Sequence, residues 1–87
     1  MEDLGKNRRK IDLIDEKIME LLAKRMVISA KIGKIKNNHN LKIKDSRREK
    51  TIMEHRVASA KNKGLSVKFM RQIFNCIFLQ SRKEQDN

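Results

Sequence analysis

The sequence predicts an all-α fold of three helices, one long and two shorter, within a single domain over residues 1–87. Proline, which breaks helices, is absent, and glycine occurs only three times. Apolar residues recur at steps of three and four, the spacing of one helix face, and two short polar segments interrupt them. The core must be aliphatic and thin, because the chain has three Phe, no Trp and no Tyr. We therefore expect it to oligomerise.

The first helix is predicted over residues 3–37. Its apolar face forms a heptad-type seam once Asn7 and Arg25 are counted as polar members. The apolar members are Leu4, Ile11, Ile14, Ile18, Leu21, Ile28, Ile32 and Ile35. At ~1.5 Å per residue the helix is roughly 50 Å long, which is too long for a chain of this size to cover. It must either pack along a partner chain or protrude.

A polar turn is predicted over Asn37–Lys44, followed by a second helix over residues 46–62. The asparagines and the histidine of NNHNLKIK favour a turn over a continued helix. Ser46 and Glu49 have the spacing of a capping box, with Asp45 just before them. The modest apolar face of this helix consists of Ile52, Met53, Val57, Ala58 and Ala60.

The third helix is predicted over residues 67–85, after a second turn at KNKGLS. Gly64 suits the left-handed residue that ends a helix, and Ser66 suits the N-cap of the next one. The residues expected to face inward are Met70, Ile73, Phe74, Ile77 and Phe78. A long helix followed by two shorter ones is typical of an all-α bundle.

The chain is strongly basic, with 22 Lys and Arg against 11 Asp and Glu. This charge suits nucleic acid, an acidic membrane or a small anionic metabolite, but a solvated basic face has the same composition. The single cysteine, Cys76, excludes an intrachain disulfide and a multi-cysteine metal site and fits a cytoplasmic protein. We see no signal peptide and no run near the ~18 apolar residues of a membrane helix. We expect no membrane, metal or cofactor.

Polar residues that interrupt the apolar faces are the candidate site residues. Arg25 takes a seam position, and Lys36 returns to nearly the same face eleven residues later, ~16 Å along the helix. Arg8 flanks the seam near its beginning, while Ser81 and Gln85 continue the inward face of the third helix. An unpaired buried cation is costly. Either Arg25 fixes the register of a coiled coil, or these groups converge on a ligand.

The inward-facing groups suit a compact dianion that carries a hydroxyl. Arg48 and Glu49 add a cation and a carboxyl at the end of the second helix's apolar face. The chain shows no nucleophile–base pair, no HExxH motif and no phosphate-binding loop. His39 lies in the turn and His55 beside Arg56, so both histidines are expected at the surface. Any chemistry would come from positioning and charge stabilisation.

Four segments together carry a family resemblance that covers nearly the whole chain. They are RRKIDLIDEKIMELLAKR (Arg8–Arg25), IGKIK (Ile32–Lys36), KDSRRE (Lys44–Glu49) and IFNCIFLQSRKEQ (Ile73–Gln85). In order and spacing they resemble the all-helical class of chorismate mutases, which are small intertwined homodimers that convert chorismate to prephenate. The resemblance implies a cytoplasmic homodimer in phenylalanine and tyrosine biosynthesis that needs no cofactor.

The resemblance also implies a role for each site residue. Arg25 and Arg8 resemble the arginines that bind the two substrate carboxylates, and Arg8 would reach into the partner protomer's site. Lys36 resembles the lysine that contacts a carboxylate and the ether oxygen of the breaking bond, and Gln85 resembles the second donor to that oxygen. Lys36, Gln85 and Arg25 are thus the expected catalytic residues. The other expected substrate contacts are Glu49 at the ring hydroxyl, the backbone of Asp45 beside it, and Arg48 and Ser81 in the pocket wall.

Two features depart from the family pattern. The connector NNHNLKIK lacks the proline often found there, and Gln80 and Arg82 make the run before Gln85 polar. We expect neither departure to touch a catalytic position.

Two other functions would also fit part of the sequence. An isochorismate–pyruvate lyase on the same fold would use the same cations, but that branch generally lacks the residues seen here as Arg48, Glu49 and Ser81. A basic helical nucleic-acid-binding protein would fit the net charge of +11. The bases of a bound nucleic acid would find few aromatic side chains to stack on, and the chain shows no nucleic-acid recognition motif. We therefore expect no nucleic acid as a partner.

Overall fold

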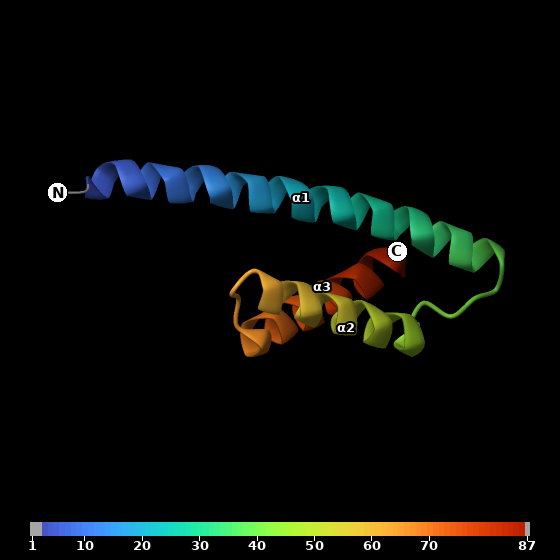
Figure 1. Ribbon diagram of the computed structural model, residues 1–87. Coiled ribbons are helices and arrows are strands. Elements are labelled where there is room, and N and C mark those ends of the chain that lie inside the picture. Colours follow the sequence, from blue (N-terminus) through green and yellow to red (C-terminus); the bar gives the residue numbers. More distant parts are fainter. Residues whose placement is uncertain (1–2, 87) are drawn as a thin grey trace.

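The fold consists of helices that lie side by side, with the second and third folded back along the C-terminal half of the first (Figure 1). The computed structural model describes residues 3–86. Over this range the helices are α1 (Leu4–Asn38), α2 (Ser46–Asn62) and α3 (Val67–Gln85), and no strand is present. The predicted all-α class is confirmed, and each predicted helix boundary lies within one residue of the observed one.

Side-chain caps begin α1 and α3. Asp3 Oδ1 accepts hydrogen bonds from the backbone N–H groups of Gly5 at 2.9 Å and Lys6 at 3.3 Å. Ser66 Oγ accepts one from the N–H of Phe69 at 3.2 Å, so the predicted cap of the third helix is confirmed. Each cap satisfies donors that the first helical turn leaves unpaired, which is typically worth about 1 kcal/mol.

The start of α2 differs from the prediction. Asp45, not Ser46, is the N-cap, and its Oδ1 accepts a hydrogen bond from the N–H of Arg48 at 3.0 Å. The prediction of a capping box between Ser46 and Glu49 is therefore wrong, because α2 begins one residue earlier than such a box requires. This shift leaves the Glu49 carboxylate available for a partner outside α2.

Both turns use a left-handed residue to end the preceding helix. After α1, Asn40 has a φ of 55°, and the N–H of Leu41 bonds to the carbonyl of Lys36 at 2.8 Å. After α2, Gly64 has a φ of 71° and the same pattern follows. This is the Schellman arrangement, in which Gly and Asn are the usual left-handed residues. The connector between α1 and α2 thus turns on Asn40 without a proline.

The core lies between α2 and α3. Ile52, Met53 and Val57 of α2 pack with Phe78 of α3, and the half-buried Phe74 packs against them. Helix α3 also packs along α1, so it is the central element of the fold. The walls of any site between α1 and α2 must therefore be joined through α3.

The apolar seam of α1 is exposed. Its eight aliphatic members are between 40% and 64% exposed. The structure has a radius of gyration of 16.4 Å, against about 12 Å for a compact chain of this length. Its accessible surface is 7457 Å², about 2,000 Å² more than a compact monomer of this mass shows. Among the described residues, no helix is long and apolar enough to cross a bilayer.

Candidate active site

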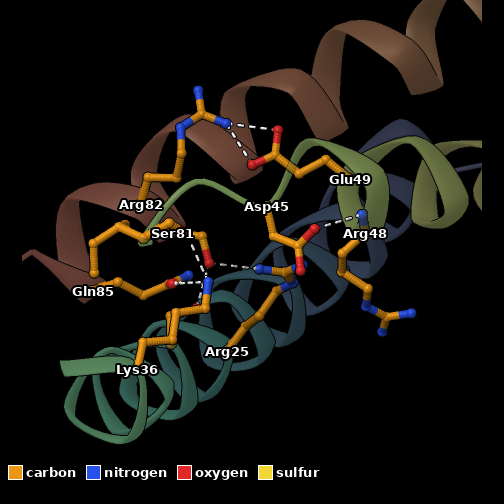
Figure 2. A network of polar contacts seen from close by, with 10 residues as sticks. Arg25, Lys36, Asp45, Arg48, Glu49, Ser81, Arg82 and Gln85 are labelled. Carbon is orange, nitrogen blue, oxygen red and sulfur yellow. Dashed lines mark hydrogen bonds and ion pairs between the residues drawn. The ribbon is translucent and has the colours of Figure 1, made fainter. Parts of the chain in front are cut away.

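A cavity of about 370 Å³ lies where the C-terminal half of α1, the start of α2 and the end of α3 meet. This volume falls in the range of small-molecule sites. Its apolar walls are Ile28, Ile32, Ile43, Ile52 and Phe78, and its polar walls are Arg25, Ser29, Lys36, Asp45, Arg48, Glu49, Ser81, Arg82 and Gln85. Figure 2 shows most of these polar side chains, which come from all three helices and gather in one place.

Seven of the eight predicted binding residues line this cavity. They are Arg25, Lys36, Asp45, Arg48, Glu49, Ser81 and Gln85. Arg8 is not among them, because it is exposed on α1 roughly 25 Å from Arg25 along the helix, at ~1.5 Å per residue. Its place in the site of a partner protomer stays a prediction.

Lys36 and Gln85 form one end of the cavity. Lys36 Nζ donates to Gln85 Oε1 at 2.7 Å and to the carbonyl of Ile43 at 2.6 Å. An ammonium has three protons and no acceptor, so one proton remains for a ligand. The amide oxygen of Gln85 must face Lys36, which leaves its NH₂ group as a second donor. The cavity thus holds two neighbouring donors whose orientations are mutually fixed.

Arg25 is held by a pair of serines. Its Nη1 donates to Ser81 Oγ at 3.1 Å, and Ser81 Oγ is hydrogen-bonded to Ser29 Oγ. Both serines are buried. Ser29 was not predicted, although it follows Arg25 by four residues and so lies one turn further on the same face. The guanidinium keeps further N–H groups for a ligand.

Burial lowers the pKa of Arg25 from its ordinary value, and repulsion by Arg56 and Arg48 lowers it further. The ordinary pKa of arginine lies so far above neutrality that the side chain stays charged at pH 7. Its charge is nevertheless costly, because it is partly withdrawn from water and repelled by neighbouring cations. A carboxylate beside it would offset both costs.

Gly33 sets how closely α1 and α3 approach. It is buried in α1, and a Cβ at this position would collide with the backbone of Gln85. Only a residue without a side chain lets the last turn of α3 lie directly against α1. This close approach brings Gln85 within reach of Lys36, so the donor pair depends on a glycine that binds nothing itself.

The wall on the side of α2 holds an ion pair. Arg82 Nη1 lies 2.7 Å from Glu49 Oε1 and 2.6 Å from Glu49 Oε2. Arg82, which was not among the predicted site residues, lines the cavity. It follows Ser81 and precedes Gln85 by three residues, so one turn of α3 carries all three. That spacing was the signal available in the sequence.

The arrangement can bind and orient an anion. The cavity wall carries four cationic side chains and two carboxylates. Within residues 3–86, no three His, Cys, Asp or Glu residues gather to hold a metal. His39 and His55 are both exposed, which confirms that prediction. The chemistry offered by these walls is therefore hydrogen bonding and charge, directed at a small anionic molecule.

Residues 7–86 match the protein family described as chorismate mutase type II. The chain belongs to this family. The match runs from before Arg8 to just past Gln85, so it includes every predicted site residue. The all-helical resemblance expected from the four sequence segments is confirmed.

Several named proteins are similar to the chain. The T-protein of Haemophilus influenzae is 30% identical over 93% of this chain and 22% of its own length. A bifunctional chorismate mutase/prephenate dehydratase of Aquifex aeolicus is 44% identical over 62% of this chain and 15% of its own length. The chorismate mutase of Methanocaldococcus jannaschii is 41% identical over 62% of this chain and 54% of its own length. The chain thus matches about half of this last relative and less than a quarter of the other two.

A solved structure has the same fold along nearly its full length. It is a conserved hypothetical protein from Pyrococcus furiosus, with a TM-score of 0.73 and 38% sequence identity. The similarity covers 94% of this chain and 93% of that one. The arrangement of α1, α2 and α3 is therefore shared with a protein of similar size.

Proposed function

We propose that residues 1–87 form a chorismate mutase domain that rearranges chorismate to prephenate for the biosynthesis of phenylalanine and tyrosine. In this reaction an ether C–O bond breaks and a C–C bond forms within one molecule, so no atom or proton is transferred to the enzyme. The observation that carries the proposal is the fixed donor pair of Lys36 and Gln85 in a cavity that also holds Arg25. We place the reaction in the cytoplasm, where an exposed thiol such as Cys76 stays reduced.

Substrate binding would begin with the two carboxylates. Arg25 presents a planar fork that suits bidentate contact with a carboxylate, and its bond to Ser81 keeps that fork in place. Arg48 lines the cavity beside it. Holding both carboxylates fixes the flexible substrate in the chair-like shape that the rearrangement needs, so part of the entropy is lost on binding rather than in the reaction.

Catalysis would come from the developing charge on the ether oxygen. The third proton of Lys36 and the amide NH₂ of Gln85 are the donors available to that oxygen. Both are oriented before the substrate arrives, because each holds the other. Preorganised donors stabilise a developing charge more than water does, since they need not reorganise during the reaction.

A second copy of the chain would complete the site. The uncovered seam of α1 and the surface excess of about 2,000 Å² match the apolar interface of an obligate homodimer, which buries 2,000 Å² or more. Two α1 helices packed along their seams would form a coiled-coil-like pair. We propose that this pairing carries Arg8 of each protomer to its partner's cavity, where it meets a substrate carboxylate.

The test is turnover by the purified protein, with chorismate and isochorismate supplied in parallel and the products identified. Formation of prephenate from chorismate is the expected result. Release of pyruvate from isochorismate alone would keep the fold and replace the activity with that of a lyase. If neither is consumed, nucleic-acid binding is measured against salt, because phosphate contacts weaken steeply as salt rises.

A further inference from the structure

Arg82 gives the cavity a feature that the binding roles above do not use. Its guanidinium contacts both oxygens of Glu49, and both contacts come from the same nitrogen, Nη1. The pair joins α3 to α2 across the wall of the cavity, as Figure 2 shows. About a quarter of each side chain is exposed, at 26% for Arg82 and 24% for Glu49. The pair is therefore partly shielded from water but open to a ligand.

The pair fixes where the Glu49 carboxylate points. Asp45 provides the N-cap of α2, so no contact in the first turn of α2 ties Glu49 down. A free glutamate side chain samples several rotamers, and ordering it on ligand binding costs free energy. Arg82 orders it beforehand. Each carboxylate oxygen has two acceptor directions, so contact with Arg82 leaves others open to the cavity.

We propose that Arg82 is a positioning residue, which holds the Glu49 carboxylate ready to accept the hydrogen bond of the substrate's ring hydroxyl. This inference rests on the proposed mutase function. It assigns Arg82 an action through Glu49 rather than a direct contact with the dianion. The hydroxyl does not react, so its hydrogen bond to Glu49 stabilises the bound substrate and the transition state equally.

The geometry makes a specific statement about which residue can replace Arg82. Because one nitrogen makes both contacts, the planar fork of arginine is not used in this pair. A single ammonium offers the same charge and donors to both oxygens. Arg82→Lys should therefore keep most of the function, whereas Arg82→Met should lose it. A residue that acted through its fork would show the opposite response to lysine.

The experiment is a double-mutant cycle in chorismate turnover, using wild type, Arg82→Met, Glu49→Gln and the double variant. Arg82→Met is expected to lower kcat/KM about tenfold, a middle value for coupled neighbours, mainly through KM. In the Glu49→Gln background the same change is expected to have less than about a twofold effect. Arg82→Lys is expected to stay within about threefold of wild type.

Lys83→Met is the matched control. Lys83 is the next residue on α3 and is exposed. Its replacement by methionine removes the same unit of positive charge as Arg82→Met. It should leave KM unchanged, which separates the effect of Arg82 from a general loss of basic charge. Thermal unfolding of every variant is measured as well, because a purely structural ion pair would move the midpoint without changing KM in the folded protein.

Three results would overturn the assignment. An undiminished loss from Arg82→Met in the Glu49→Gln background would mean that Arg82 acts on the ligand directly. Wild-type KM in Arg82→Met would mean that the pair has no role in binding. Both leave the proposed function intact, since wild type still makes prephenate. Failure of wild type to consume chorismate removes the proposed function and this inference with it.

Discussion

Lys36 and Gln85 share a hydrogen bond whose direction is fixed, because the ammonium at 2.7 Å can only donate and the amide oxygen must accept. The amide NH₂ of Gln85 consequently remains as a donor for another partner. This relationship couples two residues that are far apart in the sequence. It also specifies what a change at either one should do.

Gln85→Glu should convert the enzyme into one that works only in acid. A carboxylate cannot donate and would repel the developing negative charge, so at pH 7 we expect kcat/KM to fall about 10²–10³-fold. The protonated acid can donate, so the rate should rise as the pH falls toward and below the ordinary glutamate pKa of about 4.3. The measurement is kcat/KM between pH 3 and pH 8, with wild type as control, because Lys36 favours the carboxylate and moves the rise below the ordinary glutamate pKa. A loss of equal size at every pH would contradict the donor role of Gln85.

Arg25→Met should abolish most activity without loss of helix. We expect kcat/KM to fall at least about 100-fold, the usual cost of losing a preorganised charge. Stability should hold or rise, because burial and the repulsion of Arg56 and Arg48 oppose this charge in the folded chain. Circular dichroism and thermal unfolding check the second point.

Arg25→Lys separates charge from shape at the same position. We expect it to recover less than about a tenth of the lost activity, because an ammonium cannot bond Ser81 and also grip a carboxylate with two parallel donors. Full activity in Arg25→Ala would remove this residue from the site and restore its structural interpretation as a register-setting polar residue.

Gly33→Ala should be destabilising, although alanine is the better helix former. In an exposed helix interior this change stabilises by about 1 kcal/mol. At Gly33 the new Cβ meets the Gln85 backbone, so we expect the free energy of unfolding to fall by about 1–3 kcal/mol. We expect kcat to fall as well, because Gln85 is displaced from Lys36. Gly5→Ala is the matched control, because a Cβ there meets nothing closer than 3.4 Å. Urea unfolding compares the two, and equal effects would mean that the close approach is relaxed in solution.

The seam of α1 should make the chain dimeric. Sedimentation is expected to give twice the chain mass of 10.3 kDa. Ile18→Glu places a charge on the seam, where Ile18 is 50% exposed in the single chain, and should weaken the dimer and the activity together. Lys17→Gln changes charge by the same unit beside the seam and should do neither. A wild-type chain that stays a folded monomer would contradict the intertwined assembly.

Mixing two inactive variants should restore activity if Arg8 acts across the dimer. Arg8→Met and Arg25→Met each damage both sites of their own homodimer. After unfolding and refolding together, half of the dimers are mixed, and each mixed dimer has one complete site. Roughly a quarter of wild-type activity is then expected, by the two-fold symmetry of the assembly. Arg8 acting within its own chain would give no recovery.

The sequence was a sufficient guide to the helices and to most of the site. Periodicity placed α1, α2 and α3, and Gly64 and Ser66 marked the second turn, because these are local signals. The sequence was less reliable about which side chains bond to one another or cap a helix. Asp45 and Ser46 are near-equal N-caps, so the choice between them depends on the backbone path of the connector rather than on residue type.

Two polar residues of the cavity were missed for a different reason. Ser29 is buried on a side of α1 that the pattern of aliphatic residues does not mark, and Arg82 follows the buried Phe78 by four residues but is itself charged. The opposite error occurred at Ala58, which was expected on the apolar face of α2 but is exposed. Tertiary packing decides which residues around a helix are covered by neighbouring helices. The sequence of one helix does not contain that information.

The start of α2 at the cavity wall has an electrical consequence. Aligned peptide dipoles give a helix N-terminus roughly half a positive elementary charge. Asp45 and Glu49 both belong to this end of α2 and line the cavity, so the dipole meets two carboxylates there. It offsets part of their negative charge, which would otherwise weaken the attraction of the cavity's cations for a dianion.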